Sequence, residues 1–378
     1  KKMAQWNRVP LIDYIELIGG GTPKTTVPEY WNGNIPWLSV KDFNNDKRYV
    51  YSTEKHISQS GFENSPTKML HKDDIIISAR GTVGEIAMIP FDMAFNQSCY
   101  GIRASRGIDQ PFLYYLLKNC ISQLKRMTHG SVFDTITRDT FANIEVDIPD
   151  AETQKRISSV LADIDNKIEV NDAINDNLHQ QAATLFKALF VDLTPFDGTM
   201  PPNWTISTLG DATEMGAGGD KPKESSPVKT PLCPYPIYSN GINDYGLYGY
   251  TNDPKIKVES VTVSARGTIG YVCLRHTPYV PIVRLVTLIP DTKVLSAKYL
   301  YLYLRQLHIT GTGTTQQQLT VPDFRKTEII IPDKNTMDSF TETVTPLFEQ
   351  IWANEDENTK LAEVRDALLP KLMSGEID

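Results

Sequence analysis

Two long segments of the chain place apolar residues at alternating steps of three and four. Residues 154–190, which contain neither Gly nor Pro, hold the first series, and residues 340–372 hold the second. This spacing is the pattern of a coiled-coil seam, so both segments are predicted to be long helices. The first series is Ile157, Leu161, Ile164, Ile168, Asn171, Asn175, Leu178, Ala182, Leu185 and Leu189, and the second is Phe340, Val344, Leu347, Ile351, Asn354, Asn358, Leu361, Arg365, Leu368 and Leu372.

Each predicted seam carries two asparagines near its centre, one helical turn apart. They are Asn171 and Asn175 in the first segment and Asn354 and Asn358 in the second. If the helices pack antiparallel about a pseudo-two-fold axis, the four side chains meet. Buried seam asparagines then fix the register and orientation of the helices at a cost in stability. The alternative is that the helices splay there and leave the asparagines in water.

Pro346 and Pro370 are predicted to interrupt the second helix. Proline is tolerated in the first turn of a helix, but elsewhere it removes a backbone hydrogen bond. Pro346 is therefore expected either to lie in the first turns or to kink the helix. At about 1.5 Å per residue, each helix would be roughly 50 Å long, which is more than either half of the chain needs for its own core.

The remaining sequence is a β-rich repeat. Residues 78–84, Ser-Ala-Arg-Gly-Thr-Val-Gly, return 186 positions later as residues 264–270, Ser-Ala-Arg-Gly-Thr-Ile-Gly. Apolar runs rich in Ile and Val flank both copies, so each copy is predicted to be the turn of a β-hairpin. Residues 112–117 and 299–304 also match each other and predict a helix in both halves.

The repeat and the helices together define the expected architecture. The fold class is α+β, with two β-rich globular domains separated by two long antiparallel coiled-coil helices. The expected segments are a first globular domain over 1–150, a helix over 151–195, a second globular domain over 196–333 and a second helix over 334–378.

Composition and charge narrow the class of protein. The four cysteines are scattered without a CxxC pair, and no apolar run is long enough to span a membrane, so a cytoplasmic protein is expected. The net charge of −8 is unevenly distributed. Residues 1–150 carry 17 basic and 17 acidic side chains and 196–332 carry 13 and 11, whereas the two helical segments carry 4 against 7 and 4 against 11. The globular domains are thus near neutral and only a locally positive DNA-binding face is possible.

The sequence contains no complete catalytic motif. There is no HExxH, clustered His and Cys, or GxSxG, so no metal ion or nucleophile is expected in this chain. The Gly-rich run at 19–25 has Pro23 where a phosphate loop needs glycine. A nuclease-like spacing links Asp150 to Asp165 and Lys167, but the last two lie inside the predicted coiled coil. The Asn/Asp-Pro-Pro-aromatic motif of amino-methyltransferases is also missing.

The layout resembles the specificity subunits of Type I restriction–modification complexes. The resemblance covers essentially the whole chain and rests on the order and duplication of several short motifs. The motifs are the openings Trp6…Leu11-Ile-Asp13 and Trp204…Leu209-Gly-Asp211, Gly20-Gly-Thr-Pro23, Asn32-Gly-Asn-Ile-Pro-Trp37, the two Ser-Ala-Arg-Gly-Thr turns, and Ala367 to Ile377 at the end of the second helix.

The resemblance implies that the two globular domains are target recognition domains for the two halves of a bipartite, asymmetric sequence in double-stranded DNA. The helices would set the gap between the halves and dock two methyltransferase subunits, which use S-adenosylmethionine. Restriction subunits, which carry a motor and a nuclease and need ATP and Mg, would join them. This chain would hold no cofactor and would not be an enzyme. Residues 39–72 and 215–250 differ strongly, so unlike half-sites are expected.

DNA-reading side chains are usually Arg, Lys, Asn, Gln, Ser or Thr on loops that face a groove. The candidates in the first domain are Thr22, Lys24, Ser39, Lys41, Lys68 and Arg80. Those in the second are Lys221, Lys223, Ser239, Asn240, Asn243, Arg266, Gln316, Gln317 and Gln318. Because Arg80 and Arg266 lie in a duplicated turn, a scaffold role is favoured for them, and any DNA contact they make is expected to be with phosphate rather than with bases.

An alternative function uses the same architecture. A coiled-coil spacer could present two β-rich domains to protein or carbohydrate ligands, and the mild charge of the globular domains is compatible with it. Steep loss of duplex affinity with salt would distinguish a DNA-binding protein from such a spacer.

Overall fold

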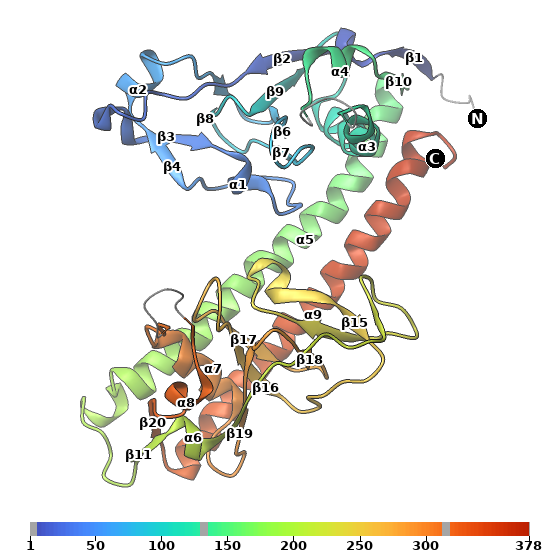
Figure 1. Ribbon diagram of the computed structural model, residues 1–378. Coiled ribbons are helices and arrows are strands. Elements are labelled where there is room, and N and C mark those ends of the chain that lie inside the picture. The colour runs from blue at the N-terminus through green and yellow to red at the C-terminus, as the bar shows by residue number, and fades with distance from the viewer. Residues whose placement is uncertain (1–5, 129–134, 312–317, 378) are drawn as a thin grey trace. The chain divides into compact units, whose positions relative to one another are not determined.

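The computed structural model describes residues 6–128, 135–311 and 318–377. The chain divides into two compact units, one made of residues 1–173 with 354–378 and the other of residues 174–353. Each unit contains one β-rich globular domain and a part of both long helices (Figure 1). The predicted α+β class with two repeated domains is therefore confirmed.

The globular domain of unit 1 has two four-stranded sheets and a two-stranded ribbon. Its strands are β1 (Asn7–Pro10), β2 (Ile15–Gly19), β3 (Trp31–Leu38), β4 (Lys55–Ile57), β5 (Met69–Leu70), β6 (Ile75–Ser78), β7 (Ile86–Met88), β8 (Met93–Phe95), β9 (Cys99–Ala104) and β10 (Glu145–Ile148). Its helices are α1 (Val40–Phe43), α2 (Gln59–Glu63), α3 (Gln110–Thr128) and α4 (Arg138–Ala142), with 3-10 turns at Leu11–Tyr14 and Pro28–Tyr30. The sheet orders are β2-β9-β6-β7 and β4-β3-β8-β5, and β1 pairs with β10.

Strand β6 shows why this domain has two cores. Successive side chains of a strand point to opposite faces. Ile75 and Ile77 enter a core that includes Phe112 and Leu116 of α3, whereas Ile76 enters a second core with Phe95 of the other sheet. A run of three isoleucines is thus explained by a strand that is buried on both faces.

The globular domain of unit 2 repeats this arrangement. Its strands are β11 (Thr205–Thr208), β12 (Thr213–Ala217), β13 (Ser225–Ser226), β14 (Tyr235–Tyr238), β15 (Leu247–Thr251), β16 (Ser260–Val263), β17 (Val272–Arg275), β18 (Val280–Pro281), β19 (Val286–Pro290) and β20 (Glu328–Ile331). Its helices are α6 (Leu209–Ala212), α7 (Ala297–Gln306) and α8 (Val321–Phe324), with 3-10 turns at Thr194–Phe196 and Asn243–Gly246. The sheet order β12-β19-β16-β17 matches β2-β9-β6-β7, and β14·β18 is a parallel pair like β3·β8.

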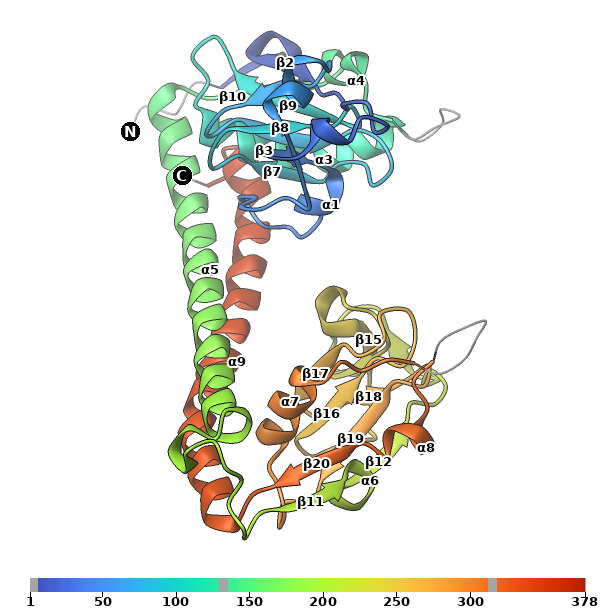
Figure 2. The same cartoon turned by 90° about the vertical axis from the view of Figure 1, so that its left-hand side faces the viewer.

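The two long helices are α5 (Ala151–Phe186), which is followed by a π-helical turn at Lys187–Val191, and α9 (Lys334–Met373). Figure 2 shows them side by side and antiparallel. Most predicted seam residues are buried or half-buried, but Leu185 is exposed and Phe186 is buried in its place. A straight helix has 3.6 residues per turn, so a seam with an average spacing of 3.5 drifts around its surface.

Three of the four seam asparagines are buried, and Asn171, Asn175 and Asn358 form hydrogen bonds across the helices. In unit 1 the Asn171 side-chain amide donates to Asn358 Oδ1 at 2.8 Å, and Asn358 donates to Asp172 at 2.9 Å. In unit 2 Asn175 donates to the Ile351 carbonyl at 3.3 Å. Asn171, Asn175 and Asn354 are at most 7% exposed, so the alternative in which they are solvated is wrong for these three. Their role in fixing the register stays a prediction.

The expected interruption of the second helix is wrong. Helix α9 continues through both Pro346 and Pro370, and Pro346 lies well beyond its first turn. The residues two before and two after Pro346 are Val344 and Phe348, and both are buried in the core of unit 2. Burial of that face outweighs the loss of one backbone hydrogen bond, while the Pro346 side chain stays exposed.

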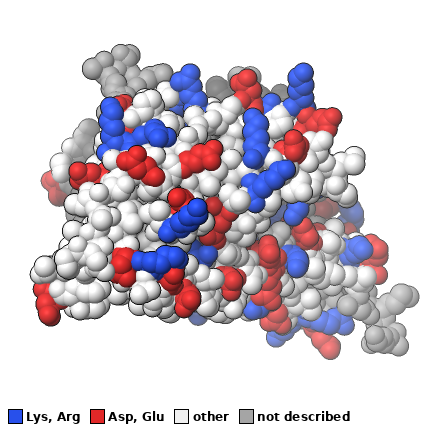
Figure 3. Space-filling view, turned by 90° about the horizontal axis from the view of Figure 1, so that it is seen from below, with Lys and Arg blue, Asp and Glu red and all other residues white. Residues whose placement is uncertain are grey.

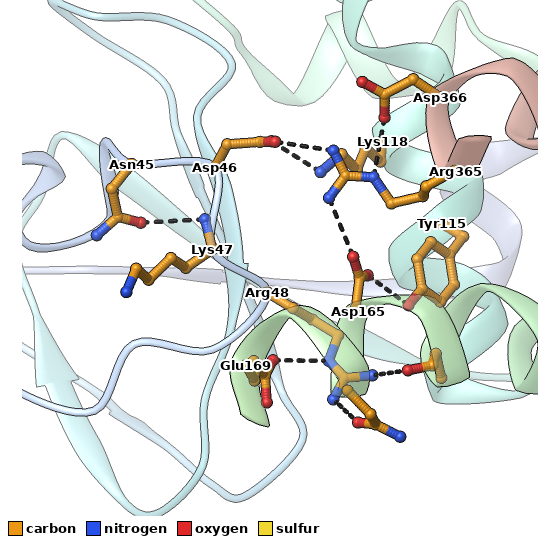
Figure 4. Close-up of polar contacts among 12 residues, drawn as sticks. Asn45, Asp46, Lys47, Arg48, Tyr115, Lys118, Asp165, Glu169, Arg365 and Asp366 are labelled. Atoms are coloured by element: carbon orange, nitrogen blue, oxygen red, sulfur yellow. Dashed lines mark hydrogen bonds and ion pairs between the residues drawn. The ribbon is translucent and has the colours of Figure 1, made fainter. Parts of the chain in front are cut away.

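An ionic cluster centred on the buried pair Arg365 and Asp165 joins the globular domain of unit 1 to both long helices (Figure 4). Arg365 of α9 donates to Asp165 of α5 at 3.0 Å and to Asp46 at 2.9 Å. Tyr115 of α3 donates to the second oxygen of Asp165 at 2.6 Å, and Lys118 pairs with Asp46 at 2.8 Å. Burial alone would lower the pKa of Arg365, but its carboxylate partners raise the pKa above its ordinary value. The guanidinium is therefore held in its charged form.

The segment next to Asp46 extends this contact along α5. We call residues 46–51 the strap. Arg48 is buried, donates to the Ala162 carbonyl at 3.3 Å and forms an ion pair with Glu169 at 3.3 Å. Lys47 pairs with Asp172 at 2.9 Å. The strap therefore follows α5 over about three turns.

In unit 2, the helix positions equivalent to these charged residues carry uncharged side chains. In the helix repeat, Ala182 of α5 is equivalent to Arg365 of α9. Phe348 and Trp352 of α9 are likewise equivalent to Asp165 and Glu169 of α5. Phe348 contacts Tyr301, with ring centroids 5.8 Å apart. His276 stacks on Trp352 at 4.1 Å. The contact is thus ionic in unit 1 and aromatic in unit 2.

We expect Arg365→Met to destabilise unit 1 by about 3–5 kcal/mol, because it leaves Asp165 buried without a counter-charge. The double variant Asp165→Leu/Arg365→Met should lose less than Arg365→Met alone, since no unpaired charge then remains. Urea unfolding of the full chain, followed by circular dichroism, measures both. Simple addition of the two single losses would show that the charges are not coupled.

Candidate DNA interface

Three loops converge in each globular domain, and we define them by residue. The Gly-rich loop covers residues 19–25 in unit 1 and 216–223 in unit 2. The hairpin turn covers the duplicated residues 78–84 and 264–270. The tip turn covers residues 96–99 and 282–285, directly after the parallel strands β8 and β18.

The tip turn has the same backbone bonds in both units. In unit 1 Cys99 N–H donates to the Asn96 carbonyl at 3.3 Å, and Asn96 N–H donates to the Leu38 carbonyl at 3.0 Å. In unit 2 Leu285 donates to Ile282 at 3.0 Å, and Ile282 donates to Tyr238 at 2.9 Å. Each tip turn is therefore a four-residue turn anchored to the neighbouring parallel strand.

The tip turn is linked to the hairpin turn by different groups in the two units. In unit 1 the Ser98 carbonyl accepts from Ala79 N–H at 2.8 Å and from Arg80 N–H at 3.2 Å. In unit 2 the Asn240 side chain takes this place. Its Oδ1 accepts from Ala265 N–H at 2.7 Å, and its Nδ2 donates to the Val283 carbonyl at 2.6 Å. Both ends of the Asn240 amide are thus used to position loops.

The Gly-rich loop lies directly against the tip turn. Gly21 N–H donates to the Phe95 carbonyl at 3.0 Å, and a Cβ added to Gly20 would lie 2.0 Å from the Asn96 carbonyl oxygen. In unit 2 Gly218 N–H donates to the Leu285 carbonyl at 2.8 Å. A Cβ on Gly218 would lie 2.7 Å from the Ile282 nitrogen. The glycines are required because the backbones approach so closely.

The hairpin turn is largely scaffold. In unit 1 Ser78 Oγ donates to the Thr82 carbonyl at 2.5 Å and accepts from Glu85 N–H at 2.8 Å. Gly81 and Gly84 have positive φ angles, as do Gly267 and Gly270 of the second copy. The duplicated sequence is therefore needed for backbone conformation, while Arg80 and Arg266 project from its exposed part.

A match to a known protein family identifies the class of protein. The model of the Type I restriction modification DNA specificity domain matches this chain twice, over residues 3–180 and 201–363. The chain belongs to this family. The spacer alternative, with protein or carbohydrate ligands, is not needed to explain the two β-rich domains.

Relatives agree with this assignment along the length of the specificity chain. The Type I restriction enzyme MjaIX specificity subunit of Methanocaldococcus jannaschii is 28% identical, with 98% of this chain and 93% of the relative covered. The Type I restriction enzyme HindI specificity subunit of Haemophilus influenzae is 26% identical, covering 70% and 77%. The fold is similar to the crystal structure of the Type-I restriction-modification system S subunit from M. genitalium, with a TM-score of 0.58, 15% identity and coverage of 98% and 97%.

The structure gives each predicted DNA-contact residue of unit 1 a defined place in the specificity chain. Thr22 hydrogen-bonds Gln97 of the tip turn, and Lys24 is exposed on the Gly-rich loop. Ser39 caps α1 through Asp42, with Ser39 Oγ to Asp42 Oδ2 at 3.0 Å. The other three candidates, all exposed, are Lys41, which lies 4.0 Å from Glu54, Lys68 and Arg80. Thr22 and Arg80 thus meet at the tip turn, whereas Ser39 has a structural role.

The candidates of unit 2 are also divided. Lys221 lies over the Tyr248 ring at 5.2 Å, and Arg266 donates to Gln318 Oε1 at 3.1 Å. Asn240 bridges two loops as described above. Three further candidates, Lys223, Ser239 and Asn243, are exposed or half-exposed, and Ser239 N–H donates to the Gly246 carbonyl at 2.8 Å. Gln316 and Gln317 lie outside the described residues. DNA contact by any of these side chains stays a prediction.

The part of the chain that the structure describes contains no candidate metal site. It has no group of three or more His, Cys, Asp or Glu side chains that could hold a metal ion. The nuclease-like Asp165 is committed to Arg365, and Asp150 caps α5 by accepting from Thr153 N–H at 2.9 Å. Within the same residues, no helix combines the length and apolarity needed to cross a membrane.

On the face that Figure 3 views, the described residues form no single basic stripe. Figure 3 shows Lys and Arg side chains interspersed with Asp and Glu over the face that it views. Strong nonspecific attraction to phosphates normally needs clustered positive charge. Contacts at the three convergent loops are therefore better candidates for recognition than a broad electrostatic surface.

Proposed function

We propose that this chain reads a bipartite, asymmetric sequence in double-stranded DNA, with one half-site for each globular domain. The observation that carries this proposal is the repeated convergence of the Gly-rich loop, the hairpin turn and the tip turn. The same backbone scaffold occurs twice, as a reader of two half-sites requires. Membership of the DNA specificity family supports DNA as the ligand.

The two half-sites should differ because the loops on the scaffold differ. The Gly-rich loop carries Thr22-Pro23-Lys24 in unit 1 and Asp220-Lys221-Pro222-Lys223 in unit 2. The hydrogen-bonding groups offered to DNA therefore differ at matching positions. Unlike half-sites make the whole target asymmetric.

We further propose that the long helices dock two methyltransferase subunits and set the gap between the half-sites. Both helices are uninterrupted, and α5 exposes apolar side chains that its own unit does not cover. They are Val160, Val170, Ile174 and Leu185, which are 36–53% exposed. An apolar surface on an acidic helix suits a protein partner better than a phosphate backbone.

The partner subunits would then carry out the catalysis. The methyltransferase subunits would bind S-adenosylmethionine and modify adenine, and restriction subunits would use ATP and Mg to cleave unmodified DNA. The residues of this chain would only bind, orient and select the sequence. The near-neutral globular domains fit a subunit whose DNA clamp is completed by other chains. We place this activity in the cytoplasm, where such a complex meets DNA.

Sequencing of methylated adenines in cells that co-express this chain with its cognate methyltransferase tests the function. We expect one split motif with two unlike halves and a fixed gap. The isolated chain, incubated with DNA and labelled S-adenosylmethionine, should transfer no methyl group. No new methylation despite a purified, soluble complex would contradict the proposal.

Substitution of the exposed apolar pair on α5 tests the docking surface. Val170→Lys/Ile174→Lys should strongly reduce co-purification of the methyltransferase, because two charges would be buried in the contact. The stability of the chain alone should change by no more than about 0.5 kcal/mol, since both side chains are exposed. Gln180→Lys, at an exposed polar position of α5, is the matched control and should bind normally. Unchanged binding by the double variant would exclude this surface.

A further inference from the structure

The tip turns display different side chains at equivalent positions, and only the turn of unit 2 has positive φ angles at its two central residues. The register of the sheets is the same in both units. Ser78 pairs with Cys99 at the end of β6·β9, and Val263 pairs with Val286 one position earlier in β16·β19. The repeat distance of 186 residues therefore makes Gln97 of unit 1 equivalent to Val283 of unit 2, and Ser98 equivalent to Arg284. Gln97, Val283 and Arg284 are exposed, and none was among the residues selected from the sequence.

The turn in unit 2 is held in an unfavourable backbone conformation. Val283 has a φ of 52° and Arg284 a φ of 60°, although this left-handed region favours glycine and asparagine. Two bonds to the Gly-rich loop hold the turn, Val283 N–H to the Gly219 carbonyl at 2.9 Å and Arg284 N–H to the Gly218 carbonyl at 2.8 Å. An arginine held at such a position points to a function for its side chain.

The Arg284 side chain is available to a ligand. It is exposed and makes no hydrogen bond or ion pair with any other residue that the structure describes. Arg275, by contrast, donates to Thr262 and lies 3.6 Å from the centroid of the Tyr238 ring. A guanidinium on a fixed turn loses little backbone freedom when it binds.

A hydrogen bond from the Gly-rich loop restrains the side chain of Gln97. The Thr22 hydroxyl, on the Gly-rich loop, donates to Gln97 Oε1. This bond directs the amide nitrogen away from Thr22 and restrains the side chain before any ligand binds. The tip turn of unit 1 thus presents a restrained amide at its first exposed position, and the tip turn of unit 2 presents an unbonded guanidinium at its second.

We propose that the tip turns are the base-reading elements of the two domains. Arg284 donates two hydrogen bonds to O6 and N7 of a guanine in the half-site of unit 2. Gln97 forms two hydrogen bonds with N6 and N7 of an adenine in the half-site of unit 1. Asn240 is a positioning residue, because its amide ties the Arg284 turn to the hairpin turn. This inference rests on the proposed function.

The test uses the complex with the methyltransferase and the split motif of the unaltered chain. Arg284→Ala should relax one guanine position in one half of the motif and leave the other half and the gap unchanged. Duplexes altered at that base pair should then bind as well as the original target, whereas the unaltered chain should discriminate by roughly 5- to 150-fold. Gln97→Ala should relax one adenine position in the other half.

Two control variants separate base reading from other roles. Lys229→Ala, at an exposed position outside the three convergent loops, should leave the motif unchanged. Val283→Gly keeps Arg284 and removes the side chain that suits this φ least, so it should retain the guanine. Retention of the motif by this variant shows that the turn tolerates substitution.

Several outcomes would overturn the inference. Equal loss of affinity for all sequences in Arg284→Ala, with the salt slope reduced by about one, would assign Arg284 to a phosphate. A motif unchanged in both Arg284→Ala and Gln97→Ala would exclude the tip turns as readers. Absence of any split motif with the unaltered chain would instead refute the proposed function itself, which the first measurement of the series reveals.

Discussion

Each globular domain completes its hydrophobic core with residues from both long helices. In unit 1 the core includes Leu161 of α5 and Leu372 of α9, and in unit 2 it includes Phe186 of α5 and Phe340 of α9. Neither domain can bury its apolar face fully unless the helices are paired. Since the cores close only on the paired helices, the folding of each β-rich domain is tied to the same antiparallel contact.

The contact is built differently in the two units, although the sheets repeat. Unit 1 buries the Arg365–Asp165 pair and lays the strap along α5, whereas unit 2 uses an aromatic cluster around Phe348. Buried ion pairs contribute little net stability but are strongly unfavourable when one partner is missing. A globular domain placed on the wrong helix end would therefore leave charges unpaired. The asymmetry thus favours one arrangement of domains on helices over the other.

Much of this fold was predictable, because its main signals are periodic or duplicated. The heptad spacing predicted α5 and α9, and the repeated hairpin turn predicted the paired strands around Ser78 and Ser264. The errors arose where tertiary burial overrides a local rule, as at Pro346, or where the seam drifts, as at Leu185. The strap and the tip turns were missed since nothing local marks Arg48 or Arg284. Their roles emerge only from hydrogen bonds between segments distant in sequence.

If two independent readers share one scaffold, exchange of one globular domain should change only its own half of the target. The most direct measurement is the methylation motif of a chimera in which residues 204–332 are replaced by the matching domain of a relative with a known target. We expect one half of the motif to change to that of the donor, while the other half and the gap remain. A change in both halves, or in neither, from a stable and methylating complex would contradict it.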